Sequence, residues 1–231
     1  MTMASRALQE FQESTDVAEL LWRSRSAAAG DYARARRQAR MTVDVTAQTA
    51  AKAAADEARK LQRSLVQAAL VRVVTAWEVF LHDLVAEYLA KNPKVFRDAW
   101  GFGGRAGAAF GDMVTALHRR PFQNLDSAKS VLRRYLGKDV LGDPTRSGVD
   151  FSSVVDAIVL RNAIVHRAGR ATRDMRDQFG LKRQSAEGYL LERPVPAPGL
   201  PATRFELIKA GVLSAALALD QRAWMSPPRA P

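Results

Sequence analysis

The residues best suited to chemistry are an arginine, an asparagine and a histidine near the end of one predicted helix, residues 151–166. At 100° per residue, valines and an isoleucine form one apolar face, and Asn162 lies near its middle. Arg161 and His166 lie on the two shoulders of that face, about 140° apart. Arginine binds anions, and histidine transfers protons near neutral pH. Two interpretations are open: a core asparagine beside an arginine and a histidine that reach solvent, or a functional site.

Other chemistries find little support in the composition. The chain has no cysteine, which excludes disulfides, thiolate nucleophiles and cysteine-ligated metals. The three histidines, His82, His118 and His166, have no paired spacing for zinc, and no Ser-His-Asp arrangement can be argued from them. We therefore expect no metal and no cofactor.

The charge of the chain favours acidic partners. Its 231 residues are 47% hydrophobic, enough for one domain with a core and appendages. The net charge is +11, and 27 of the 35 cations are arginine, so nucleic acid is the first partner to consider. No signal peptide and no run of about 20 uninterrupted apolar residues is evident. The sequence therefore predicts a cytoplasmic protein without a membrane partner.

The first half of the chain is predicted to be helical. A weakly periodic segment, Phe11–Trp22, ends near Gly30, and residues 31–91 contain no glycine or proline. The latter segment is one very long helix or two with a break, and an apolar stripe runs from Leu65 until Asn92-Pro93 stops it. We expect an N-terminal helical arm at 1–63, a helical domain at 64–225 and a disordered tail at 226–231.

Shorter helices alternate with loops in the second half. Predicted helices are a short one at 113–118, one at 125–135 capped by Asn124 or Asp126, the helix opened by Phe151 that ends near Gly169, and a final one from Thr203 to Trp224. The predicted connections are glycine-rich at 101–111, loop at 137–148, partly helical at 170–185, extended at 188–195 and proline-rich thereafter. These patterns predict an all-α bundle of four to five packed helices with a long N-terminal helical arm.

Three segments resemble one known superfamily. DAIVLRNAIVHRAG (156–169) resembles the RN-x-x-V-H signature of the HEPN superfamily, here Arg161–His166. PFQNLDSAKSVLRRYLG (121–137) is similar to the segment before the motif helix in branches related to the RiboL-PSP type. ALVRVVTAWEVFLHDLVAEYL (69–89) resembles their first core helix, including a glutamate at Glu78. The resemblance covers about residues 65–185 and is specific at 161–166.

This resemblance implies a metal-independent endoribonuclease in which the motif helices of a homodimer form one composite cleft. His166 would act as general base or acid on the ribose 2′-OH and the leaving 5′-oxygen. Arg161 would stabilise charge on the phosphorane, and Asn162 would orient the histidine or a phosphate oxygen. The products would be a 2′,3′-cyclic phosphate and a 5′-hydroxyl.

Two further sets of charged residues have open roles. Glu78 is a solvated or ion-paired shoulder residue, or it pairs with Arg161 or His166 and orients them. The basic residues after the motif line an RNA track or form an ordinary solvated face. They are Arg167, Arg170, Arg173, Arg176, Lys182 and Arg183.

The implied setting is a toxin–antitoxin or antiviral-defence system, with RNA as substrate and an antitoxin or defence protein as a possible partner. A second hypothesis is a catalytically inactive HEPN-like module that binds RNA, nucleotide or protein. A third is a helical assembly protein whose alanine-rich segment at 31–63 docks on another chain and whose motif is structural.

Overall fold

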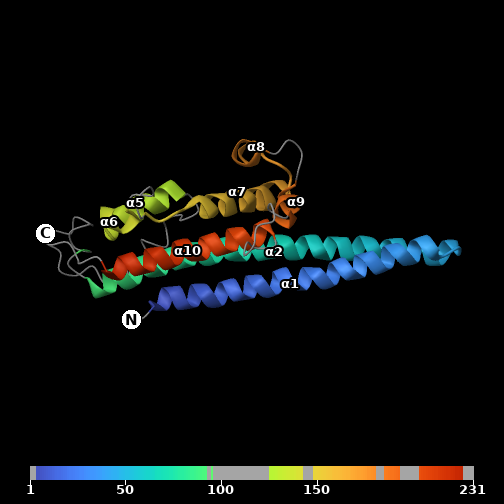
Figure 1. Ribbon diagram of the computed structural model, residues 1–231, viewed down its shortest axis with the longest axis horizontal. Helices are drawn as coiled ribbons and strands as arrows, with labels where there is room; N and C mark the ends of the chain where they lie inside the picture. Colours follow the sequence, from blue (N-terminus) through green and yellow to red (C-terminus); the bar gives the residue numbers. More distant parts are fainter. Residues whose placement is uncertain are drawn as a thin grey trace, which may run out of the picture. The chain divides into compact units, whose positions relative to one another are not determined.

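The computed structural model describes residues 4–92, 95, 125–142, 148–180, 185–192 and 203–225. Within these ranges all regular secondary structure is α-helical, which confirms the predicted all-α class (Figure 1). The described helices are α1 Arg6–Met41, α2 Val45–Lys91, α5 Leu125–Tyr135, α6 Lys138–Leu141, α7 Ser152–Arg167, α8 Arg173–Phe179, α9 Ala186–Leu191 and α10 Arg204–Met225.

Helix ends that carry strong local signals lie where the sequence predicts them. Helix α2 ends at Lys91, directly before Asn92-Pro93, and the Asn92 side chain donates a hydrogen bond to the Tyr88 carbonyl at 3.0 Å. Helix α5 has the predicted bounds, and α7 and α10 begin and end within about two residues of theirs. The long helical segment is broken once, at residues 42–44.

Three local predictions are wrong. Helix α1 does not end near Gly30 but continues to Met41, because one glycine costs a helix only about 1 kcal/mol. The segment predicted as extended at 188–195 is helical up to Leu191, and the Ser185 hydroxyl caps that helix by accepting a hydrogen bond from the Gly188 N–H at 3.1 Å. The predicted loop at 137–148 contains α6.

Several predictions lie outside the described residues. They are the glycine-rich connection at 101–111, the short helix at 113–118, the Asn124 cap, Lys182 and Arg183, the proline-rich connection after 195, and the tail at 226–231.

The chain forms two compact units, and α1, α2, α7 and α10 contribute residues to both. The first unit comprises residues 1–13, 74–158 and 207–231, and the second comprises 14–73 and 159–206. The predicted division into an arm at 1–63 and a domain at 64–225 is a separate proposal that this grouping does not test.

Aromatic side chains build the core of the first unit. Trp77 lies 5.8 Å from Phe80 and 6.2 Å from Phe151, measured between ring centroids. Phe80 also contacts Phe11 of α1 at 5.3 Å. Buried Asp220 of α10 accepts hydrogen bonds from the Ser5 N–H and the Trp224 indole N–H, so its carboxylate is satisfied inside the core. Residues near the N-terminus thus belong to this core.

The second unit contains a helical hairpin formed by α1 and α2, which run side by side in Figure 1. At its inner part Trp22 of α1 stacks on Phe205 with ring centroids 4.1 Å apart. Towards the turn, the buried residues are small: Ala28, Ala39, Ala51 and Ala55. Alanines let two helix backbones approach closely without a broad apolar core.

Thr203 caps α10, as the sequence predicts. The buried Thr203 hydroxyl accepts a hydrogen bond from the Glu206 N–H at 3.3 Å. Thr203→Ala is expected to lower the free energy of unfolding by about 1 kcal/mol, because an N–H of the first helical turn loses its acceptor. Urea denaturation measures this, and Thr203→Ser, which keeps the hydroxyl, should stay near wild type. Equal losses in both variants would contradict the cap.

One described helix, α2, is long and apolar enough to cross a membrane by length and composition alone. Half of its apolar stretch is buried in the protein, and the core helix of a soluble protein passes the same test. The predicted cytoplasmic location and absence of a membrane partner stay predictions.

Candidate functional site

The motif residues lie in the last two turns of α7, within the second unit. Arg161 is half-buried, whereas Asn162 and His166 are exposed. The Arg161 Nη1 donates a hydrogen bond to the Asn162 Oδ1 at 3.1 Å. The Arg161 Nε is buried and has no hydrogen-bond partner among the described residues. The bond to Asn162 therefore orients the guanidinium and uses one of its five N–H donors.

Helix α7 buries a different side from the one that the sequence predicts. Its buried residues are Val154, Ala157, Leu160, Ala163 and Ile164. At 100° per residue this side is rotated by about a third of a turn from the predicted face. Asn162 is exposed, so the core-asparagine interpretation is wrong.

The predicted face of α7 is instead only partly covered. Val155 and Ile158 are half-buried, and Val165 is 50% exposed. Helix α7 thus has apolar residues on two sides, of which one packs inside the protein. Asn162, Val165 and His166 share the other side.

A tight turn ends the motif helix. Ala168 and Gly169 both have positive φ, 51° and 76°. The Gly169 N–H donates to the Ala163 carbonyl at 3.0 Å, which satisfies one of the last carbonyls of the helix. The Gly169 carbonyl in turn accepts a hydrogen bond from the Ala186 N–H of α9 at 2.9 Å. Backbone bonds therefore fix the end of α7 directly after His166.

Sequence reasoning missed the two side chains that support this turn. Glu187 of α9 is 6% exposed, and a methyl group added at Gly169 would overlap its carboxylate. The Gln67 side chain of α2 donates a hydrogen bond to the Glu187 Oε1. Glycine after a helix is a recognisable signal, but nothing in the local sequence marks Glu187 or Gln67 as its neighbours.

Four of the basic residues after the motif, Arg167, Arg170, Arg173 and Arg176, lie in the described part of the chain and are exposed, as an RNA track and a solvated face both require. Arg167 lies in the last turn of α7, and Arg170 follows the turn. Arg173 and Arg176 lie on α8, where the Arg173 Nε is 3.6 Å from the Asp177 Oδ2. Asp174 and Asp177 reduce the positive charge of this helix, and the choice between the two interpretations stays open.

Glu78 is half-buried on α2 and belongs to the first unit. Arg161 and His166 belong to the second unit. The pairing of Glu78 with either residue therefore stays a prediction.

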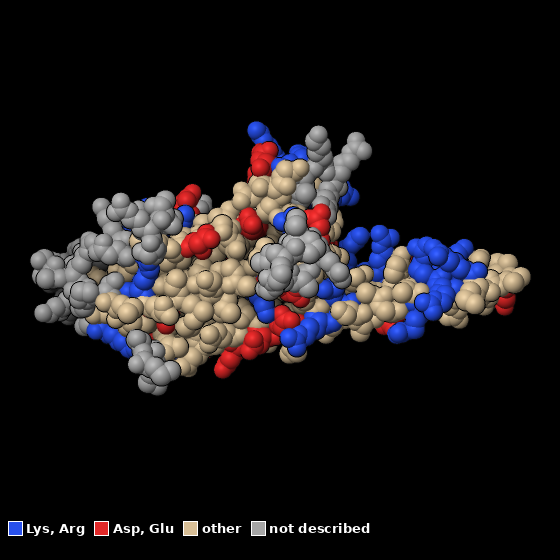
Figure 2. All heavy atoms as spheres, in the orientation of Figure 1, with Lys and Arg blue, Asp and Glu red and all other residues tan. Residues whose placement is uncertain are grey.

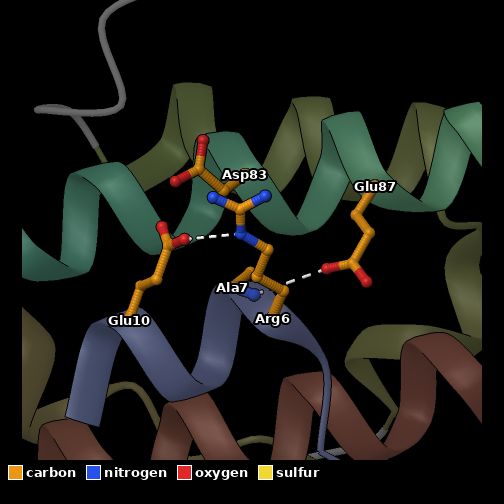
Figure 3. A pocket seen from close by; sticks show the side chains of 5 residues that line it. All are labelled: Arg6, Ala7, Glu10, Asp83 and Glu87. Carbon is orange, nitrogen blue, oxygen red and sulfur yellow. Dashed lines mark hydrogen bonds and ion pairs between the residues drawn. The ribbon is translucent and has the colours of Figure 1, made fainter. Parts of the chain in front are cut away.

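A pocket of about 320 Å³ lies elsewhere, between the start of α1 and α2 in the first unit (Figure 3). Arg6 donates a hydrogen bond to the Glu10 Oε1 at 2.6 Å, and the Ala7 N–H donates to the Glu87 Oε2 at 3.4 Å. The bond to Glu10, aided by the charges of Asp83 and Glu87, raises the pKa of Arg6. The carboxylates of the pocket already have internal partners, so we assign no ligand to it.

Among the described residues, no group of three histidine or acidic side chains is arranged to hold a metal ion. Comparison with known proteins adds no family: no protein-family model, curated protein or solved structure matches this chain. The motif helix and its exposed polar side are therefore the candidate site that carries a functional argument.

Proposed function

We propose that this chain is a metal-independent endoribonuclease of the HEPN type that acts as a homodimer through the exposed side of α7. The observation that carries the proposal is the two-sided character of α7. One apolar side is buried, and the other presents Asn162, half-exposed Val165 and exposed His166. A second copy would cover this apolar side and bring two histidines and two arginines together.

The proposed reaction uses the ribose 2′-oxygen of the RNA as nucleophile. One His166 accepts the 2′-OH proton, and the 2′-oxygen forms a bond to phosphorus. The Arg161 guanidinium stabilises the charge of the phosphorane. The bond from phosphorus to the 5′-oxygen then breaks, and that oxygen takes a proton from the second copy's His166. The products are a 2′,3′-cyclic phosphate and a 5′-hydroxyl.

The proposed biological setting is a toxin–antitoxin or antiviral-defence system, which rests on the motif resemblance alone. An antitoxin or another defence protein would then restrain the nuclease. RNA is the proposed substrate, and the net charge of +11 supports a polyanionic partner.

Wild-type protein is expected to cleave single-stranded RNA in excess EDTA and to leave cyclic-phosphate ends. The matched control is the same oligonucleotide with 2′-deoxyribose throughout, which lacks the nucleophile and should remain intact. Mass spectrometry of the products identifies the ends. Cleavage that needs a divalent metal, or that cuts the deoxy substrate equally, would exclude this chemistry. RNA binding without cleavage would favour an inactive binding module.

If the protein dimerises through α7, a charged side chain at position 165 should weaken the homodimer strongly. Val165→Glu is expected to weaken the homodimer at least tenfold, because it places a carboxylate in the apolar interface. Val79→Glu is a matched control, since Val79 is also 50% exposed on a helix. Light scattering over a concentration series measures both. A monomeric wild type, or equal dimerisation of the two variants, would contradict the composite site.

A further inference from the structure

The outer part of the α1–α2 hairpin carries a concentration of positive charge, visible as blue atoms over the hairpin in Figure 2. We define the basic arm as residues 31–63, which lie wholly within the second unit. Its eight cations, all exposed, are Arg34, Arg36, Arg37, Arg40, Lys52, Arg59, Lys60 and Arg63. The four acidic residues of the arm are Asp31, Asp44, Asp56 and Glu57.

Core packing does not explain this arm. The only residues that it buries are Ala39, Ala51 and Ala55. The Gln48 side chain bonds to the Ala39 carbonyl at 3.2 Å, which ties α2 to α1 close to the turn. The two helices therefore form a narrow ridge, and both helices of the hairpin carry cations. A ridge that buries so little apolar surface contributes little stability by itself.

Internal partners neutralise few of these cations. Arg34 pairs with Asp31, and Arg36 donates a hydrogen bond to the Tyr32 hydroxyl at 2.9 Å. Within the described part of the chain, Arg37, Arg40 and Arg63 form no ion pair or hydrogen bond. Their charges are available to an external anion.

We propose that the basic arm binds the phosphate backbone of the RNA that the motif site cleaves, an inference that rests on the proposed function. The cations on α2 extend from Lys52 to Arg63, about 16 Å at 1.5 Å per residue. A ligand that contacts them all must carry repeated negative charges over that length, as a nucleic acid does. Five of the eight form no ion pair or hydrogen bond with the described residues, and they are spread between the two helices, which suits contacts with successive phosphates. They are Arg37, Arg40, Arg59, Lys60 and Arg63.

The tip of the arm fits other ligands less well. Met41, Val43 and Val45 are exposed at the turn, up to 97% for Val43, but they form too small an apolar area for a stable protein interface. Insertion of this tip into a lipid surface would also bury Asp44, whose carboxylate accepts a hydrogen bond from the Thr46 N–H at 2.8 Å. An inserted tip reaches about 5–10 Å into a bilayer, so the cations from Lys52 to Arg63 would make few contacts with the lipid.

The test measures binding of a 30-nucleotide single-stranded RNA by fluorescence anisotropy between 50 and 300 mM KCl. All proteins carry His166→Ala to suppress cleavage. The arm variant adds Arg37→Gln, Arg40→Gln and Arg63→Gln, and the control variant adds Arg6→Gln, Arg133→Gln and Arg134→Gln, which remove the same charge from the first unit.

The arm variant is expected to bind at least tenfold more weakly at 100 mM KCl. Its slope of log affinity against log salt should be smaller by about 2, because each lost phosphate contact on a single strand removes about 0.7. Val43→Ser, which changes only the apolar tip, should bind RNA as before. Equal affinity and slope in the arm and control variants would overturn the inference. It would also be overturned if the arm substitutions weakened binding to anionic vesicles but left binding to RNA unchanged.

Cleavage separates this inference from the proposed function. Wild type and the arm triple variant, both with His166 intact, are given a dinucleotide that offers a single phosphate. Equal cleavage by the two proteins, together with lost RNA binding in the arm variant, supports recruitment by the arm. If wild type cleaves no RNA while the arm effect on binding persists, the nuclease proposal fails and the RNA-binding arm stands.

Discussion

His166→Ala is expected to lower the rate of RNA cleavage by about 10²- to 10⁴-fold, the usual range for loss of a general acid or base. The two copies of His166 supply both proton transfers in the proposed reaction, so one substitution removes both. The melting temperature is expected to stay within about 1 °C of wild type. His166 is exposed and forms no hydrogen bond with the described residues, so its removal breaks no structural contact.

The control for this variant is His82→Ala. His82 lies on α2 in the first unit, where its Nδ1 is 2.9 Å from the Asp83 carboxylate. It is expected to keep wild-type cleavage, although its stability can fall. If His166→Ala lowers the melting temperature by several degrees, the histidine supports the fold, and the assembly-protein hypothesis is favoured. If it cleaves RNA at the wild-type rate, His166 is not catalytic.

Gly169→Ala is expected to destabilise the protein by about 2–5 kcal/mol. A positive φ costs an alanine about 1–2 kcal/mol, and the added methyl group meets the buried Glu187 carboxylate, an overlap that costs about 1–3 kcal/mol more. Because this turn follows His166 by three residues, we also expect RNA cleavage to fall. Urea denaturation and the cleavage assay measure the two effects on the same protein preparation.

Gly180 gives a matched control for the backbone contribution. It has a φ of 64°, and nothing lies within 4 Å of where its Cβ would be. Gly180→Ala should therefore cost only the 1–2 kcal/mol of the positive φ. In a protein that also carries Glu187→Ala, the loss of unfolding free energy caused by Gly169→Ala should fall to the same value. If Gly169→Ala costs no more than Gly180→Ala in wild type, the carboxylate does not constrain the turn.

The sequence predicts helices well where a local signal defines their ends. Asn92-Pro93 stops α2, and Thr203 caps α10, because a proline or a capping hydroxyl acts on its own few residues. The prediction of a helix end near Gly30 is wrong, because one glycine between strong helix formers does not end a helix. The sequence does not predict the short helices α6 and α9, because helices of four to six residues depend on their surroundings.

The buried side of α7 could not be predicted from hydrophobicity alone. Valines and isoleucines mark one side as the more apolar, but the protein buries the side with Ala157, Leu160 and Ala163. Small residues are buried where another element approaches closely, and that depends on the rest of the fold. The motif residues could be named from the sequence, whereas the direction in which Asn162 and His166 point could not.

The supports of the candidate site depend on contacts that are distant in sequence. Gln67 and Glu187 are 120 residues apart and meet by a hydrogen bond. Neither residue belongs to a motif, and a single sequence contains no signal that pairs them. Gly169 could be recognised as a helix terminator, but its contact with a buried carboxylate could not.

Helix α2 is one continuous helix of 47 residues whose two parts have different surroundings. Its residues from Val66 to Leu89 include many fully buried apolar side chains, whereas its first turns bury only alanines. Backbone amides of the first part can therefore open by local fraying, while those of the second part open only when a packed core is lost. Amide exchange with deuterium would thus slow by several orders of magnitude along a single uninterrupted helix. The end that opens easily is also the end that carries the basic arm, which leaves the arm free to adjust to an irregular polyanion at little cost to the core.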